Sequence, residues 1–127
     1  MRAPPSNADV EDSHAVRSTL GRISISSDVV AHIAGHVAQE SYGVVGMSAR
    51  GRVGRLLARD RIRQGIVVTG DDDGGIALDL YVVVEYGLNL AEVASTLRSR
   101  VTYEVERLTG LTVASVEVHI QDVRRSA

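Results

Sequence analysis

The stretch Gly75–Val123, GIALDLYVVVEYGLNLAEVASTLRSRVTYEVERLTGLTVASVEVHIQDV, decides the fold of this chain. Apolar and polar residues alternate over positions 76–84, which predicts a long strand with one buried face. Asn89 is a good helix N-cap, and apolar residues then recur at helical spacing. Gly110 predicts the end of that helix, and the alternation returns over positions 116–120. The stretch therefore predicts a strand, a long amphipathic helix and a second strand.

The composition of the 127 residues narrows the class of protein. There is no Cys, Trp or Phe, so the core must be built from Val, Leu, Ile and Ala, and the β-branched residues among them favour a sheet. The absence of Cys excludes disulfides and thiol chemistry. The net charge of −2 gives no global attraction to nucleic acid or membrane. No apolar run approaches the roughly 20 residues of a membrane span, so we expect a soluble protein.

The rest of the chain predicts a single domain with two ends outside it. Residues 1–18 combine Pro, Ser, Asn and acidic residues without apolar periodicity, and we expect a disordered tail there. Residues 19–123 form the expected α/β domain, and residues 124–127 a frayed C-terminus. Within the domain, the alternation over Leu20–Ser26 predicts a first strand, and Ser26 or Ser27 is the N-cap of a helix that ends near Ser41–Gly43.

The middle of the chain predicts the remaining strands. Val44–Ser48 is either a short strand or a packed turn, and Gly65–Thr69 is a strand. The run of Asp and Gly over positions 70–75 predicts a hairpin turn into the long strand. We therefore predict an α+β fold: a two-layer β-α-β-β-α-β sandwich with a mainly antiparallel sheet and both helices on one face. The order resembles a split βαβ arrangement, although strand order does not follow from sequence.

Six arginines gather in the segment of residues 49–64, ARGRVGRLLARDRIRQ. They are Arg50, Arg52, Arg55, Arg59, Arg61 and Arg63. Guanidinium groups bind the phosphate oxygens of nucleic acids and of anionic lipid headgroups, so these six residues are candidates for phosphate or lipid-headgroup contact. The segment lacks the aromatic residues that usually stack on single-stranded RNA. The competing interpretation is a solvated basic loop, partly paired with the protein's own acids.

Two other patterns bear on metal binding. His32 and His36 stand four residues apart on a predicted helix, a spacing that places two imidazoles on one face. The sequence HIAGH lacks the glutamate of the zinc-protease motif, and both histidines fall opposite the apolar stripe, which favours solvated side chains. The run Asp71–Asp73 lacks the alternating oxygens and the downstream glutamate of a calcium loop, and a turn explains it better. We expect no metal and no cofactor.

The sequence gives little support to an enzyme. It contains no nucleophile elbow, no phosphate-binding loop and no dinucleotide-binding glycine motif, so we expect no catalytic residue. The polar face of the long strand carries Ala77, Asp79, Tyr81, Val83 and Glu85. This mixture of polar and apolar groups suits a protein-contact face or an edge strand. The residues therefore favour an interaction module.

Four segments in order give the chain a family resemblance: GRISISSDVVAHIAG, ESYGVVGM, LDLYVVVEYGLNLAEVA and VERLTGLTVASVEVHI. With these segments, over Leu20–Val123, the chain resembles the alkaline shock protein family of small general-stress proteins, found mostly in Gram-positive bacteria. The resemblance implies a small α/β domain without known catalytic residues. It also implies self-association and a place at the inner face of the membrane, held by a membrane-anchored partner protein. The arginine segment varies in the family, so the resemblance does not extend to it.

From the residues and the resemblance together, we expect a non-enzymatic protein of the envelope or general stress response. It would act as a scaffold or interaction module, in the cytoplasm and at the periphery of the inner face of the cell membrane. The expected partners are proteins, among them a membrane-anchored one and further copies of this chain. The alternative is a nucleic-acid-binding module that uses Arg50–Arg63, whose binding would fall steeply with salt.

Overall fold

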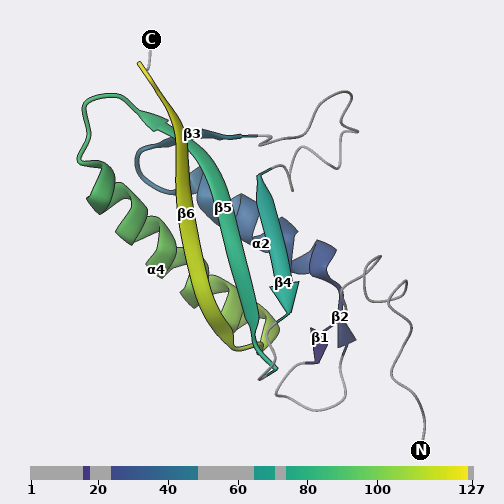
Figure 1. Cartoon of the computed structure of the whole chain (residues 1–127). Coiled ribbons are helices and arrows are strands. Elements are labelled where there is room, and N and C mark those ends of the chain that lie inside the picture. The colour runs from purple at the N-terminus through teal and green to yellow at the C-terminus, as the bar shows by residue number, and fades with distance from the viewer. Residues whose placement is uncertain (1–15, 18–23, 49–64, 71–73, 126–127) are drawn as a thin grey trace, which may run out of the picture.

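The computed structural model of the chain describes residues 16–17, 24–48, 65–70 and 74–125 (Figure 1). Two helices and a four-stranded sheet form the body of the domain, which confirms the predicted α+β class. In chain order these elements are α2 (Ser27–Glu40), β3 (Val44–Met47), β4 (Ile66–Gly70), β5 (Ile76–Glu85), α4 (Leu90–Thr109) and β6 (Val113–Arg124). Two short strands, β1 (Val16–Arg17) and β2 (Ser24–Ile25), pair with each other in a separate sheet.

The long strand β5 is the centre of the four-stranded sheet. On one side it pairs with both β3 and β4, which run antiparallel to it as expected. On the other side it pairs with β6, which runs parallel to it along its whole length. This parallel pairing follows from α4, because a helical crossover returns the chain to the same end of the sheet. The alternative that β5 is an edge strand is therefore wrong.

The strands β3 and β4 lie one after the other along the same side of β5. The residue after β3 and the residue before β4 are both hydrogen-bonded to Tyr81 of β5. Ser48 N donates to Tyr81 O at 2.8 Å, and Tyr81 N donates to Gly65 O at 2.8 Å. Gly65 has a φ of +80°, a conformation that glycine adopts without a Cβ penalty. The end of β3 and the start of β4 are thus fixed by the two backbone groups of Tyr81.

The first predicted strand lies elsewhere than expected. Of Leu20–Ser26, only Ser24–Ile25 forms a strand among the described residues, and it pairs with Val16–Arg17 instead of joining the four-stranded sheet. Val16–Arg17 belongs to the segment expected to be a tail, whereas residues 1–15 and 18 lie outside the described residues. Of the two interpretations of Val44–Ser48, the structure shows the strand, because Val44–Met47 pairs with β5 as β3.

Both helices begin at the predicted caps. Ser26 Oγ accepts a hydrogen bond from Asp28 N at 3.0 Å, and Asn89 Oδ1 accepts one from Glu92 N at 3.0 Å. Each bond satisfies one of the backbone N–H groups that a helix start leaves without a partner. Gly110 ends α4 in the left-handed conformation, with a φ of 76°. Local sequence signals therefore set both ends of α4.

The cap at Asn89 leads to a first testable prediction. Replacing Asn89 with alanine removes the side-chain acceptor of Glu92 N, and we expect the free energy of unfolding to fall by about 1 kcal/mol. Urea denaturation followed by circular dichroism measures the change. The control is Asn89→Asp, which keeps an acceptor at the same place and should stay within about 0.5 kcal/mol of the wild type. Equal losses in the two variants would contradict the capping role.

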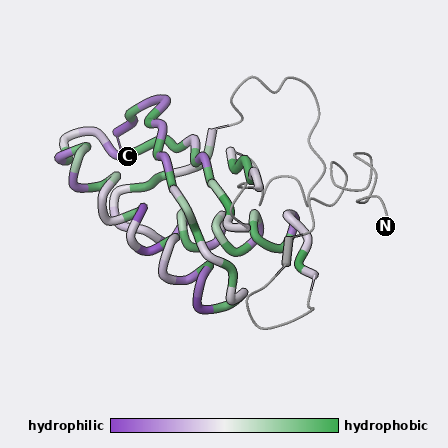
Figure 2. Tube along the Cα trace, turned by 60° about the horizontal axis from the view of Figure 1, so that its bottom comes forward, coloured by the Kyte–Doolittle hydropathy of each residue, from purple (hydrophilic) through white to green (hydrophobic). Residues whose placement is uncertain are grey.

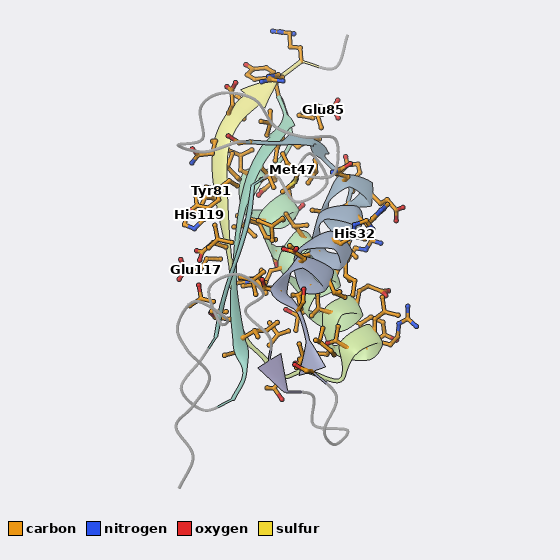
Figure 3. The ribbon with its side chains drawn as sticks, turned by 90° about the vertical axis from the view of Figure 1, so that its right-hand side faces the viewer. His32, Met47, Tyr81, Glu85, Glu117 and His119 are labelled. Carbon is orange, nitrogen blue, oxygen red and sulfur yellow. The ribbon has the colours of Figure 1, made fainter. Side chains whose placement is uncertain are left out.

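The core lies between the sheet and the two helices, which cover the same face of the sheet (Figures 1 and 3). Along β5 every second residue is at most 1% exposed: Ile76, Leu78, Leu80, Val82 and Val84. The buried residues of α4 follow at steps of four: Val93, Leu97, Val101, Val105 and Thr109. Figure 2 shows hydrophobic and hydrophilic positions interspersed along the helices and strands. The predicted buried face of β5 is confirmed.

Three apolar residues that stand at helical spacing in the sequence, one in α2 and two in α4, are exposed instead of buried. Val29 is 48% exposed, Leu90 41% and Leu108 54%. In α4 the buried stripe advances by four residues at a time, so Leu90 and Leu108 lie about 60° to its side at 100° per residue. At the last turn the buried position belongs to Thr109, whose hydroxyl donates to Val105 O at 2.6 Å. The core is therefore narrower than the apolar pattern predicts.

A polar cluster on the open face of the sheet

The face of the sheet opposite α2 and α4 carries no helix among the described residues (Figure 3), and we call it the open face. The predicted contact residues of β5 lie on it, because their neighbours in sequence point into the core. Directly paired residues of neighbouring strands share a face, which adds residues of β4 and β6. The described residues of the open face are Gly46, Val67, Thr69, Ala77, Asp79, Tyr81, Val83, Glu85, Ser115, Glu117, His119, Asp122 and Arg124. Of these, Val83 is buried, at 4% exposed.

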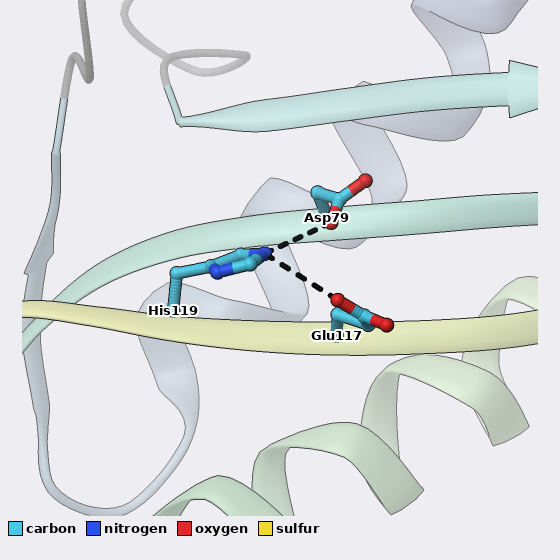
Figure 4. A group of neighbouring side chains, drawn as sticks. All are labelled: Asp79, Glu117 and His119. Atoms are coloured by element: carbon cyan, nitrogen blue, oxygen red, sulfur yellow. Dashed lines mark hydrogen bonds and ion pairs between the residues drawn. The ribbon is translucent and has the colours of Figure 1, made fainter.

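A cluster of three ionisable side chains lies near the middle of the open face (Figure 4). Asp79 pairs directly with Glu117 across the β5–β6 ladder, and Tyr81 pairs directly with His119. His119 Nε2 lies 2.9 Å from Asp79 Oδ1 and 3.9 Å from Glu117 Oε1. The side chains of His119 and Asp79 are 33% and 32% exposed, and that of Glu117 is 69% exposed. The cluster is thus half-buried on one side and open to solvent on the other.

The imidazole of His119 is held by an aromatic ring as well as by the carboxylates. The rings of Tyr81 and His119 are stacked, with centroids 4.4 Å apart and an angle of 11° between their planes. An ionised carboxylate only accepts hydrogen bonds, so His119 Nε2 carries the proton that it donates to Asp79 Oδ1. The stack fixes the plane of the imidazole, and the hydrogen bond fixes its direction.

The electrostatics of the cluster are unusual for a solvent-facing sheet. Asp79 and Glu117 are two carboxylates at directly paired positions, where like charges destabilise a sheet. Among the described residues, the one basic side chain near both carboxylates is the imidazole of His119, which is charged only when it is protonated. No arginine of the described residues pairs with them. A positive charge at this place would therefore relieve a repulsion that the strand pairing imposes.

The site residues considered from sequence lie in other places. The six arginines Arg50 to Arg63 and the run Asp71–Asp73 lie outside the described residues, so their roles stay predictions. His32 and His36 are both exposed on α2, with ring centroids 4.7 Å apart. Within the described part of the chain, the one group of three candidate metal ligands is the cluster of Asp79, Glu117 and His119.

Sequence reasoning placed Asp79 on the polar face of its strand but missed Glu117 and His119. A signal for both was present, because Val116, Val118 and Ile120 predict the buried face of the last strand and leave positions 117 and 119 on the other face. The sequence does not show that β6 pairs with β5. Only that parallel pairing brings His119 next to Asp79.

The fold and the open face together define a small two-layer α+β domain with one helix-covered sheet face and one polar sheet face. The chain belongs to the alkaline shock protein 23 family, which has a cell envelope-related function and which matches residues 15–125. This match confirms the resemblance seen in the sequence. None of the helices in the described part of the chain is long and apolar enough to cross a membrane.

Several bacterial proteins are similar to this chain over most of their length. Uncharacterized protein YloU of Bacillus subtilis is 34% identical over 113 residues, which are 86% of this chain and 93% of that protein. Uncharacterized protein Spy1614 of Streptococcus pyogenes is 35% identical over 108 residues, 82% of this chain and 88% of that protein. Uncharacterized protein YqhY of Bacillus subtilis is 29% identical over 117 residues, 91% and 83% of the two chains. No solved structure matches the chain.

Proposed function

We propose that this chain is a non-enzymatic interaction module of the envelope stress response, and that the open face is the surface with which it binds a membrane-anchored protein. The observation that carries the proposal is the open face itself. In a two-layer domain one sheet face is covered by helices, and here the other face mixes polar groups with exposed apolar ones such as Val67, which is 47% exposed. Such mixed faces are typical of protein contacts.

The charge of the open face indicates which part of a membrane-anchored protein would bind there. The described residues of the face carry the carboxylates of Asp79, Glu85, Glu117 and Asp122, against one guanidinium, that of Arg124. Anionic lipid headgroups are repelled by an acidic surface. The segments that flank membrane spans on the cytoplasmic side are rich in Lys and Arg. A basic segment next to a membrane anchor therefore complements this face, whereas the lipid surface itself does not.

A pair of matched charge variants tests the proposal. Thr69 and Ser115 flank Ala77 on the open face, and replacing both with arginine adds bulk and positive charge there. We expect the Thr69→Arg/Ser115→Arg variant to lose at least ~10-fold of its in-cell crosslinking to a membrane-anchored protein, and to leave the membrane fraction. Like charges brought together across an interface cost several kcal/mol, which is ample for such a loss.

The control is Thr96→Arg/Ser99→Arg, which makes the same replacements at exposed positions of α4. It adds the same charge on the opposite side of the domain and should crosslink like the wild type. Equal crosslinking by all three proteins, or an equal loss in both variants, would contradict a role of the open face. Crosslinking of the wild type to RNA in place of a membrane-anchored protein would contradict the proposed function itself.

A further inference from the structure

We infer that Asp79, Glu117 and His119 form a binding site for a divalent first-row transition-metal ion, and that Zn²⁺ fits the donor set best. The site would offer one imidazole nitrogen and two carboxylate oxygens from two neighbouring strands. Three protein ligands leave at least one coordination position, directed toward the solvent side of the open face. The cluster lies on the face proposed for the protein contact, but the inference does not depend on that contact.

The distances within the cluster suit a metal ion of this size. Ligands bound tetrahedrally at about 2.0–2.2 Å lie about 3.4 Å from one another. Here His119 Nε2 lies 2.9 Å from Asp79 Oδ1 and 3.9 Å from Glu117 Oε1, and the three ligand atoms all lie within 4.8 Å of one another. Both printed separations differ from this value by about 0.5 Å, a difference of the size that side-chain rotations can make up.

The cluster is held in place before any ion arrives. Asp79 lies on β5, which is paired on both sides, with Val67 of β4 and with Glu117 of β6. Tyr81 stacks on the imidazole of His119 and restricts its plane. A metal at Nε2 would replace the proton that His119 now shares with Asp79. Because the ligands are already oriented, binding would order few side chains, which favours affinity.

The charges of the cluster indicate a cation, and the imidazole indicates which kind. A divalent ion balances the two carboxylates of Asp79 and Glu117, which lie at directly paired positions of β5 and β6. Imidazole is a good ligand for Zn²⁺ and its neighbours in the series, whereas Mg²⁺ and Ca²⁺ prefer oxygen ligands throughout. The two histidines of α2 offer only two nitrogens, and no carboxylate of the described residues forms a three-ligand group with them.

Calorimetric titration of the full chain with Zn²⁺ tests the inference. We expect one bound ion per chain, and His119→Ala or Asp79→Asn should each weaken binding at least ~10-fold, since even residues that only orient a ligand usually have effects of this size. Excess Mg²⁺ should not displace Zn²⁺. The matched controls are Glu85→Gln, a carboxylate on the same face of β5 about 20 Å along the strand, and His36→Ala. Both should bind like the wild type.

Each other outcome overturns the assignment. Loss of Zn²⁺ binding in His36→Ala would place the ion on α2, and equal losses in Glu85→Gln and Asp79→Asn would indicate general attraction to an acidic face. Absence of binding by the wild type would also reject it. Circular dichroism melting curves of every variant show whether the fold is kept. If His119→Ala does not fold, Asp79→Asn, which keeps the volume of the side chain, tests the metal site on its own. The variants at Thr69 and Ser115 leave the three ligands intact, so failure of this site and failure of the protein contact are distinguishable.

Discussion

Replacing Leu80 with alanine is expected to lower the free energy of unfolding by about 2–5 kcal/mol. Leu80 is fully buried on the central strand, in the core between the sheet and the two helices. The truncation removes several buried methyl and methylene groups and leaves a cavity that rigid neighbours on both layers fill only in part. Urea denaturation followed by circular dichroism gives the difference.

The matched control for this prediction is Leu108→Ala. Leu108 belongs to the same apolar pattern in the sequence, yet it is 54% exposed on α4. Its truncation should change the free energy of unfolding by less than about 1 kcal/mol, because little buried surface is lost and alanine is the better helix former. Losses of equal size at the two positions would show that Leu108 is part of the core after all.

The second large loss of stability is expected on replacing Gly65, the residue before β4. A Cβ at this position would lie 2.6 Å from Ser48 O and 2.7 Å from Tyr81 O, and both are backbone atoms. The φ of +80° adds the strain of a left-handed conformation. We expect Gly65→Ala to lower the free energy of unfolding by at least about 2 kcal/mol, since a clash adds to a strain of about 1–3 kcal/mol.

Alanine substitutions at two other glycines distinguish the cost of the steric clash from the cost of the backbone strain. Gly87 has a φ of +99° but open space around its missing Cβ, so Gly87→Ala should cost about 1 kcal/mol. Gly46 has open space and no positive φ, and Gly46→Ala should be within about 0.5 kcal/mol of the wild type. The order of the three denaturation midpoints tests the account. A Gly65→Ala variant as stable as Gly87→Ala would contradict the close approach of the backbone.

The parts of the fold that could be predicted are those set by residues close together in the chain. The alternation that ends at Val84 predicts the buried face of β5, and Asn89 and Gly110 set the ends of α4. Each of these signals acts within one strand or one turn of helix. The apolar pattern overestimates the core at Leu108, because helical spacing alone does not show that the neighbouring Thr109 takes the buried position in the last turn.

The candidate site could not be predicted because it depends on strand pairing. Asp79 and His119 are 40 residues apart in the chain and become neighbours only through the parallel ladder of β5 and β6. Linear spacing instead pointed to His32 and His36, which are neighbours by helical geometry alone. Two histidines four residues apart are visible in a sequence, whereas a histidine and an aspartate on adjacent strands are not.

The two backbone hydrogen bonds of Tyr81 show where the chain of this domain can be lengthened. Ser48, which follows β3, and Gly65, which precedes β4, are both hydrogen-bonded to the same residue of β5. The registers of β3 and β4 are each held by their own ladders, so neither depends on the length of chain between them. For a flexible connection, doubling the length costs only about 0.6 kcal/mol of loop-closure entropy. The chain between Ser48 and Gly65 is therefore an insertion point, where a fluorescent reporter or an affinity tag can be placed without changing the register of either strand.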